Sequence, residues 1–262
     1  MKLETISQEP VTTTHSTPLL FVHGMWHGAW CWAEHFLPYF AQHGYSSYAL
    51  SLRGHGASEG HERLRWASLA NYVADIEQVV NEMRRSPVLI GHSMGGMIVQ
   101  KYLESHQAPA AVLLASAPPK GLLAATLRVA GRHPLVFLKG NLTLRAYPVI
   151  GTPGLCREML FSEGMSKTEV ETHFARMQDE SFRAYLDMML LNLPRSERVK
   201  VPVLVLGAAN DKAISVGEVD STARAYGAQP EIFPDMAHDM MLEVGWQAVA
   251  DRILKWLEKR GL

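Results

Sequence analysis

The stretch from Pro87 to Gln100, PVLIGHSMGGMIVQ, decides the fold of this chain. It begins with the apolar run Val88–Ile90, passes through Gly-His-Ser-Met-Gly, and becomes an apolar, helix-compatible run at Met97. A serine flanked in this way by glycines, where a strand meets a helix, sits on a sharp turn that projects its hydroxyl into a cleft. The pattern therefore predicts a strand–turn–helix unit that presents Ser93 as a nucleophile.

Short apolar runs that end in Gly, Pro or polar residues recur along the chain, and longer amphipathic runs separate them. Such runs are typical of strands buried on both faces of a parallel sheet. Residues 68–83 place apolar side chains at three- and four-residue spacings behind Ser68, which predicts a capped helix. The alternation predicts an α/β fold with a mostly parallel, doubly wound sheet. The expected strands lie in 18–24, 45–52, 87–93, 110–119 and 201–211, and two further helices lie in 97–106 and 245–259.

The segment 119–194 interrupts this alternation, because it has no clear buried strand. Its amphipathic runs look like helices separated by Gly and Pro, and it is far longer than a crossover connection needs. We expect a helical cap, 119–194, inserted into a core formed by 1–118 and 195–262. Ligands of open α/β sheets bind at the carboxyl edge of the strands, so the cap is expected above that edge.

Composition excludes several classes of partner. The 262 residues carry a net charge of −1, which argues against nucleic acid or an anionic membrane surface as a partner. Cys31 and Cys156 lie far apart and fit free thiols in a reducing compartment. The first 18 residues lack the apolar centre of a signal peptide, and no apolar run is long enough to span a bilayer. We expect a cytoplasmic protein without an integral membrane segment; the sequence does not predict its oligomeric state.

A serine nucleophile needs a base to take its proton and an acid to orient that base. In a strand–turn–helix architecture of this kind, the chain order is serine, acid, histidine. Asp211 follows a strong apolar run, and His238 lies in a loop before the final helix, so both are predicted to join Ser93. Asp235 and Asp239 are rival acids, and they rank lower because carboxylates this close to His238 in sequence are expected to meet the backbone.

Acyl transfer also needs hydrogen-bond donors for the oxyanion that develops on the carbonyl. The backbone N–H of Met94, the residue after the nucleophile, is one predicted donor. The second is the N–H of Met25, in the loop that follows the early strand. In the same loop we expect a structural role for His23 and leave the role of His27 open.

Taken together, these stretches resemble the α/β-hydrolase family. The resemblance implies the α/β-hydrolase fold, a Ser93–Asp211–His238 triad, Met25 and Met94 as oxyanion donors, and chemistry that needs no metal or organic cofactor. The serine motif is most similar to those of carboxylesterases, monoacylglycerol lipases and lysophospholipases. The family's usual first two strands have little room here, and 2–7 is expected to supply one of them. The stretches that carry the resemblance are HGMWHGAW (23–30), SLRGHGAS (51–58), GHSMGG (91–96), GAANDKAIS (207–215) and MAHDM (236–240).

Sibling chemistries of the family differ at single positions. Dehalogenases and epoxide hydrolases use an aspartate nucleophile, whereas position 93 is serine. Hydroxynitrile lyases that resemble this chain tend to carry Thr in place of Gly24 and Lys in place of Met236. We therefore predict hydrolysis of a small-molecule carboxylic ester with an apolar acyl chain of short to medium length. A C–C bond hydrolase or a perhydrolase with the same triad, and a non-catalytic small-molecule receptor, stay open.

Four side chains are predicted to contact the substrate. Trp26 and Trp30 follow the expected oxyanion loop, so they should lie near the reacting carbonyl. Met188 and Met189 belong to the expected cap, and methionine adapts to ligands of varied shape. We expect these four residues to line an apolar acyl pocket.

Overall fold

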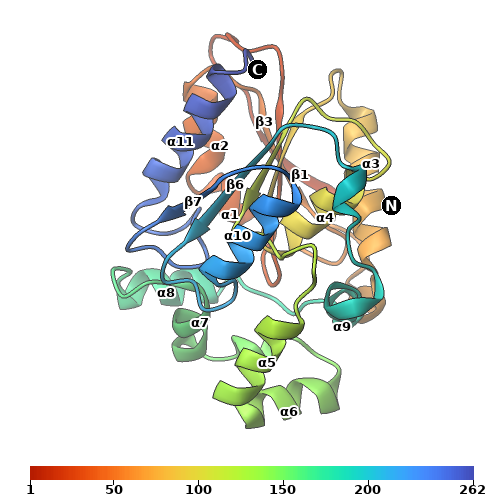
Figure 1. Ribbon diagram of the computed structural model, residues 1–262, viewed down its shortest axis with the longest axis vertical. Coiled ribbons are helices and arrows are strands. Elements are labelled where there is room, and N and C mark those ends of the chain that lie inside the picture. The colour runs from red at the N-terminus through yellow and green to blue at the C-terminus, as the bar shows by residue number, and fades with distance from the viewer.

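A computed structural model describes all 262 residues and contains one seven-stranded sheet of order β1-β3-β2-β4-β5-β6-β7 (Figure 1). Only β1 runs antiparallel, against β3, and every other neighbouring pair is parallel. All five predicted strands are present, and 2–7 supplies most of β1, as expected. The strands are β1 Glu4–Gln8, β2 Leu19–Val22, β3 Ser47–Ser51, β4 Val88–His92, β5 Ala111–Leu114, β6 Val203–Ala208 and β7 Pro230–Phe233.

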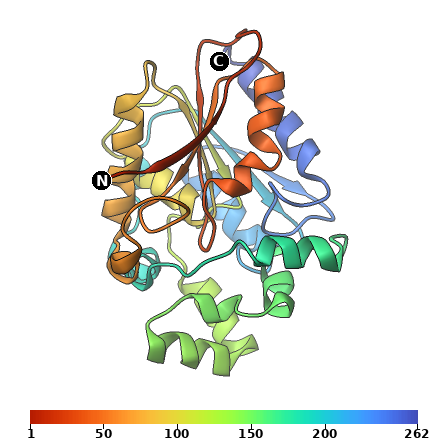
Figure 2. The same ribbon diagram turned by 180° about the vertical axis from the view of Figure 1, so that it is seen from behind.

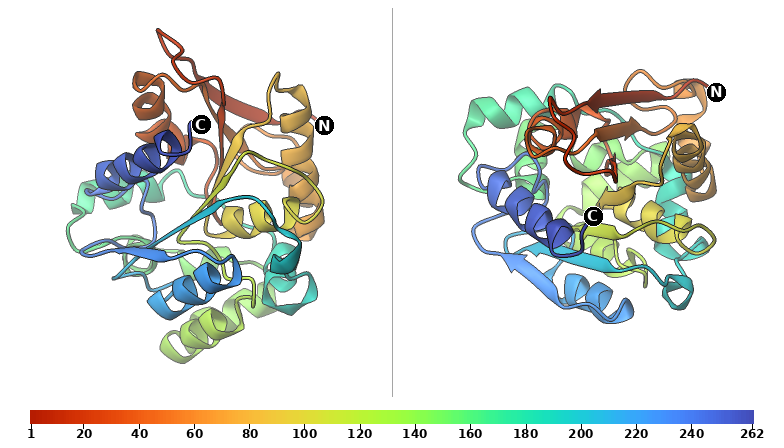
Figure 3. Two further views of the ribbon diagram at one scale, coloured as in Figure 1. Left: turned by 45° about the horizontal axis from the view of Figure 1, so that its top comes forward. Right: turned by 90° about the horizontal axis from the view of Figure 1, so that it is seen from above.

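The parallel strands are buried on both faces, because successive side chains enter two different hydrophobic clusters. In β2, Leu19 and Phe21 enter one cluster, while Leu20 and Val22 enter the other. Helices cover both faces, which confirms the doubly wound sheet and the α/β-hydrolase fold class (Figure 3). One face carries α1 Trp30–Ala33, α2 Phe36–Gln42 and α11 Trp246–Glu258; the other carries α3 Leu69–Glu82, α4 Met94–Tyr102 and α10 Val216–Ala225.

The predicted cap residue of α3 is confirmed. Ser68 Oγ accepts a hydrogen bond from the Asn71 N–H at 3.2 Å, and Asn71 Oδ1 accepts one from the Ser68 N–H at 3.0 Å. This reciprocal capping box satisfies two backbone donors that the first turn leaves free, and a cap of this kind contributes about 1 kcal/mol.

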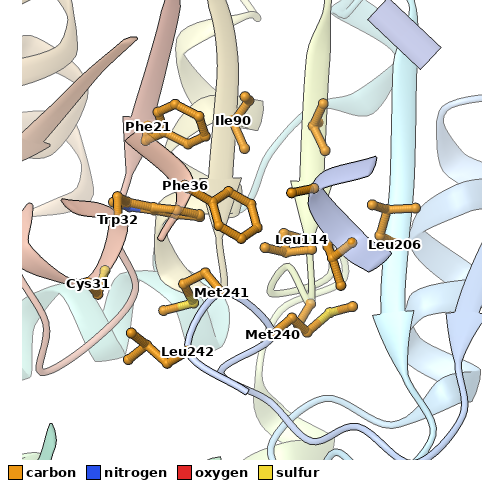
Figure 4. Packing of buried hydrophobic residues seen from close by; sticks show 14 of the residues in the cluster. Phe21, Cys31, Trp32, Phe36, Ile90, Leu114, Leu206, Met240, Met241 and Leu242 are labelled. Atoms are coloured by element: carbon orange, nitrogen blue, oxygen red, sulfur yellow. The ribbon is translucent and has the colours of Figure 1, made fainter. Parts of the chain in front are cut away.

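The loop after β7 is anchored in the core beneath the sheet. Met240, Met241 and Leu242 belong to the buried cluster that also contains the aromatic side chains Trp32 and Phe36, and Met241 is drawn closest to these two rings (Figure 4). All three loop side chains are buried, and burying each one stabilises the fold by roughly 1.5–3 kcal/mol. This anchoring fixes the segment that contains residue 238.

Between β5 and β6 the chain forms helices and no strand, and most of these helices gather at one end of the molecule, beyond the sheet (Figures 1 and 2). The described structure has no helix that is both long and apolar enough to cross a membrane. The division into a core and a cap at 119–194 stays a prediction. The helices of this segment are α5 Leu123–Arg132, α6 Pro134–Thr143, η2 Tyr147–Val149, α7 Pro153–Leu160, α8 Lys167–Phe174, α9 Phe182–Leu186 and η3 Asp187–Leu191; η1 His61–Trp66 and η4 Ser196–Arg198 lie outside it.

Candidate active site

Ser93 occupies the sharp turn between β4 and α4. Its φ of 51° and ψ of −118° lie in a region that non-glycine residues rarely adopt. The backbone is held there partly by the Ser93 N–H, which donates to the Leu114 carbonyl at 3.1 Å. A Cβ at Gly95 would approach the Val22 carbonyl oxygen to 2.3 Å, so only glycine lets α4 pack this closely. Such strain is characteristic of a serine held for reaction.

The structure brings Ser93, His238 and Asp211 together. His238 Nε2 lies 2.9 Å from Ser93 Oγ, and His238 Nδ1 lies 2.7 Å from Asp211 Oδ2. The other carboxylate oxygen of Asp211 accepts hydrogen bonds from the Ala213 and Ile214 N–H groups at 2.7 and 2.8 Å. Asp211 is thus fixed by the backbone on one side and orients the imidazole on the other.

Charge around His238 sets its proton affinity. Burial alone would lower the pKa of His238, but the charge of Asp211, its hydrogen bond and the nearby Asp239 together raise that pKa above its ordinary value. In the neutral ring, Nδ1–H donates to Asp211, and Nε2 is left to accept the Ser93 hydroxyl proton.

Two backbone N–H groups beside Ser93 donate no hydrogen bond within the protein. They belong to Met25, in the loop after β2, and to Met94, the first residue of α4. The N-terminus of α4 adds its partial positive charge at this position. A Cβ on Gly24 would lie 2.9 Å from Ser93 Cβ, so the loop that carries Met25 passes directly against the serine.

His23 supports this loop from below. Its Nδ1–H donates to the Gly24 carbonyl at 2.8 Å, and its Nε2 accepts from the Leu52 N–H at 3.1 Å. The ring is fully buried, and burial together with the neighbouring His55 lowers its pKa, so it is neutral. These contacts fit the structural role expected of His23.

His27 forms a buried ion pair behind the triad. Its Nδ1 lies 2.7 Å from the Met25 carbonyl oxygen, and its Nε2 lies 3.0 Å from Asp239 Oδ2. Both neighbours are acceptors, so both ring nitrogens donate and the ring is an imidazolium. Burial alone would raise the pKa of Asp239, but His27 lowers it, with smaller effects from His92 and His238. Asp239 therefore meets a side chain and not the backbone, which corrects our reason for ranking it below Asp211.

His92, the residue before the nucleophile, completes this network. Its Nε2–H donates to the His238 carbonyl at 3.0 Å, and burial with the nearby His238 lowers its pKa to about 3, so the ring is neutral. The segment of His238 and Asp239 is thereby tied to the loops that carry Ser93 and Met25. Sequence reasoning did not find this network, because its members lie up to 212 residues apart and only their proximity defines it.

A cavity of about 120 Å³ opens from the triad toward the helices between β5 and β6. Ser93, His238 and Met25 line one end, and side chains of α5 and α6 line the other. Most of the lining is apolar. Of the predicted substrate contacts, Trp26 is part of it. The remaining lining residues are Leu122, Ala125, Thr126, Val129, Val136, Phe137, Gly140, Asn141, Arg145, Ala146, Val149, Met159, Phe182, Tyr185, Ala213 and Ile214.

Trp30, Met188 and Met189 do not line this cavity, so the cavity gives no support to the substrate contacts predicted for them. Trp30 stacks on His173, and the Arg176 guanidinium lies 4.3 Å from its ring centre. Met188 is fully buried in the cluster formed with α3 and α4, because the π-helical turn η3 directs it toward the sheet. Met189 is half-buried outside the cavity.

One group of side chains, His92, His238 and Asp239, has donor atoms within 4.8 Å of one another, as a metal site would require. The ring nitrogens of His238 already contact Asp211 and Ser93, and His92 Nε2 contacts a carbonyl. His92 Nδ1 and Asp239 Oδ1 form no hydrogen bond within the protein. Three of the four ring nitrogens of the two histidines are thus already engaged in hydrogen bonds within the protein.

Comparison with known proteins agrees with this geometry. The model of the Alpha/beta hydrolase family matches residues 19–252, and the chain belongs to this family. A monoacylglycerol lipase of Mycolicibacterium smegmatis is 24% identical over 249 residues, covering 86% of this chain and 82% of that protein. A non-heme chloroperoxidase of Burkholderia pyrrocinia is 36% identical over 112 residues, which are 39% of this chain and 38% of that protein. The crystal structure of a Paleococcus ferrophilus monoacylglycerol lipase superposes with a TM-score of 0.74 at 21% identity, covering 99% of this chain and 100% of that one.

Proposed function

We propose that the protein is a serine hydrolase that cleaves carboxylic esters through an acyl-enzyme intermediate. The observation that carries the proposal is the continuous hydrogen-bonded line from Asp211 through His238 to Ser93, with distances of 2.7 and 2.9 Å. A hydroxyl on a strained turn, a base within reach and a fixed acid are the parts that nucleophilic acyl transfer requires.

In the acylation step, Ser93 Oγ attacks the ester carbonyl carbon while His238 Nε2 takes the hydroxyl proton. The carbonyl oxygen becomes an oxyanion, and the free N–H groups of Met25 and Met94 donate to it. Asp211 stabilises the imidazolium that forms. His238 then gives its proton to the alkoxide leaving group, and the alcohol departs.

In the deacylation step, water enters the place of the alcohol. His238 takes a proton from the water as its oxygen attacks the acyl carbon, and a second oxyanion forms against the same two N–H groups. Collapse of this intermediate returns the proton to Ser93 Oγ and releases the carboxylic acid.

The cavity lining supports an apolar acyl group of short to medium length. Its only charged side chain apart from the triad histidine is Arg145, which pairs with Asp179 at 2.6 Å. A C–C bond hydrolase acting on a dienol carboxylate needs an unpaired cation in the pocket to bind the carboxylate. The segment 119–194 offers Arg128, Arg132 and Arg157, and none of these three arginines lines the cavity. The lining therefore favours esters over that alternative.

Turnover of p-nitrophenyl esters of increasing chain length tests the proposal. The expected result is a preference for short to medium apolar chains, with turnover lost in Ser93→Ala and kept in Ser105→Ala, a matched change of an exposed serine. Turnover that survives Ser93→Ala would end the proposal. A folded protein that binds esters in the cavity without cleaving them would instead support the receptor alternative.

A second candidate, perhydrolysis, is favoured by the likeness to the chloroperoxidase of Burkholderia pyrrocinia. In this reaction hydrogen peroxide replaces water in the deacylation step, and the acyl group leaves as a peracid. The assay supplies acetic acid, which acylates Ser93 with loss of water, together with hydrogen peroxide. It follows the oxidation of bromide by the peracid. A rate well above that of Ser93→Ala is expected for a perhydrolase, and equal rates would remove this candidate.

A further inference from the structure

Helix α6 is apolar on two opposite faces. Val136, Phe137 and Gly140 face inward and line the active-site cavity. Leu135, Leu138 and Leu142, at spacings of three and four residues, share the other face, where they are 79%, 52% and 77% exposed. A helix that is apolar all round is normally buried, so the outer face of α6 lacks a partner.

Helix α5, which packs against α6, also presents leucines to solvent. Leu123 and Leu127 lie one turn apart and are both exposed. The two helices form one end of the molecule, beyond α7 and α8 (Figures 1 and 2). Nothing else in the chain covers this end, so its leucines are free to enter an apolar phase. We name the exposed side chains of α5 and α6 the leucine ridge; they are Leu123, Leu127, Leu135, Leu138 and Leu142.

The segment that carries the leucine ridge is also one-sided in charge. Residues 105–157 contain no Asp or Glu, while Lys and Arg recur through them. Carboxylates from outside this segment pair with Arg128, Arg132 and Arg145. Lys139 lies between the leucines of the outer face of α6, is exposed and forms no ion pair. We expected no anionic surface as a partner because the charge of the whole chain is near neutral. That average does not describe the outer face of α6, where the cation Lys139 has no carboxylate partner.

We propose that the leucine ridge docks on a lipid surface that carries anionic headgroups. Exposed aliphatic side chains interspersed with cations are the two features that hold an interfacial helix at such a surface. The opposite face of α6 lines the cavity, so a docked molecule places its acyl pocket next to the lipid layer. The docking itself is independent of the chemistry, whereas delivery of a lipid ester to Ser93 rests on the proposed function.

Flotation with phospholipid vesicles tests the docking without turnover. The full chain with Ser93→Ala is mixed with vesicles of phosphatidylcholine that hold about one third phosphatidylglycerol, and with vesicles of phosphatidylcholine alone. We expect binding to the anionic vesicles that weakens in high salt, because screening removes the attraction of the cations. Adding Leu135→Ser and Leu142→Ser should lower the partition coefficient about tenfold or more, since two aliphatic anchors are lost.

Two further variants locate the effect. Lys139→Glu should lower partition to anionic vesicles about tenfold and leave binding to neutral vesicles unchanged. The matched control is Val11→Ser, an exposed aliphatic residue outside the helix pair, and it should bind like its parent. Equal losses in Val11→Ser and in the leucine variants, or no flotation of the parent protein, would overturn the proposal.

The remaining outcomes separate the docking from the other proposals. Sedimentation velocity should show the same oligomeric state before and after the two leucine substitutions. If the parent protein is a dimer and the substitutions make it a monomer, the leucine ridge is an interface between copies of the chain, and lipid docking is overturned. With Ser93 present, the leucine variant should hydrolyse a soluble short ester at the parental rate. If the parent hydrolyses no ester while Ser93→Ala still floats, the proposed function fails and the docking stands.

Discussion

Replacing Asp239 by Asn tests the buried network behind the triad. The substitution keeps the size of the side chain and removes its charge. Asp239 is fully buried, and its carboxylate lies 3.0 Å from the Nε2 of His27, which is also buried. Without the carboxylate, the His27 imidazolium has no counter-charge, so the ring must lose a proton or stay charged in a dry environment.

Breaking a buried pair by removing one partner typically costs about 3–5 kcal/mol of unfolding free energy. The lower end applies here, because the new amide can still donate a hydrogen bond to a neutral His27 Nε2. A loss of about 3 kcal/mol in a chain of this size corresponds to a melting temperature lower by roughly 6–12 °C. Asp239 also helps to raise the pKa of His238, so the same variant should move the acidic limb of the activity profile to lower pH.

The assay is thermal and urea unfolding at neutral pH, with activity followed against pH on the same samples. Asp235→Asn is the matched control, because Asp235 lies four residues earlier, is exposed and should tolerate the change within about 0.5 kcal/mol. A double-mutant cycle with His27→Gln should give a coupling energy of about 1 kcal/mol or more. If Asp239→Asn unfolds like Asp235→Asn, or if the two sites show no coupling, the assignment of a buried ion pair is refuted.

Three further predictions follow from the site and its supports. Because the base must be neutral and the pKa of His238 lies above its ordinary 6.5, kcat/KM should fall on the acid side with a midpoint above that value, and a midpoint below 6.5 would contradict the charge assignment. Gly24→Ala should lower kcat about 100-fold or more with the fold intact by circular dichroism, since the new Cβ would lie 2.9 Å from Ser93 Cβ and displace the oxyanion loop. Glu243→Ala should cost about 1–3 kcal/mol in urea unfolding, because its buried carboxylate accepts from the Ser162 N–H at 2.5 Å and from the Ser162 hydroxyl at 2.6 Å; an unchanged midpoint would show that this tether is unimportant.

Most of the fold could be predicted because local sequence and global architecture agree. Short, continuous apolar runs bounded by Gly, Pro and polar residues are typical of buried parallel strands and fit few other structures. Ser68 could be identified as a cap because it stands directly before an amphipathic helix. The helices of 119–194 were also foreseeable, but their packing was not, because apolar residues on a short helix can face either a cavity or the core. Met188 shows the difference: it belongs to the core beneath η3.

The triad residues could be selected because the strand ends place them in a known order. The buried network of His27, His92 and Asp239 behind these residues could not be predicted. The partner of Asp239 is determined by the path of a loop more than 200 residues earlier in the chain. His27 and Asp239 each stood in a quoted motif, yet nothing in either motif specifies the other. The predicted substrate contact of Trp30 rested on sequence neighbourhood in the same way. Trp30 follows the oxyanion loop in sequence, but α1 directs its side chain toward His173.

The central claim is that Ser93 is the nucleophile, and covalent labelling tests it most directly. The protein is treated with a fluorophosphonate, digested, and the modified peptide is identified by mass spectrometry. The account predicts one phosphonyl group on Ser93, no labelling of Ser93→Ala, and much slower labelling of His238→Ala, because the base that activates the hydroxyl is gone. Labelling of another residue, or equal labelling of the folded protein with and without the Ser93 hydroxyl, would contradict it.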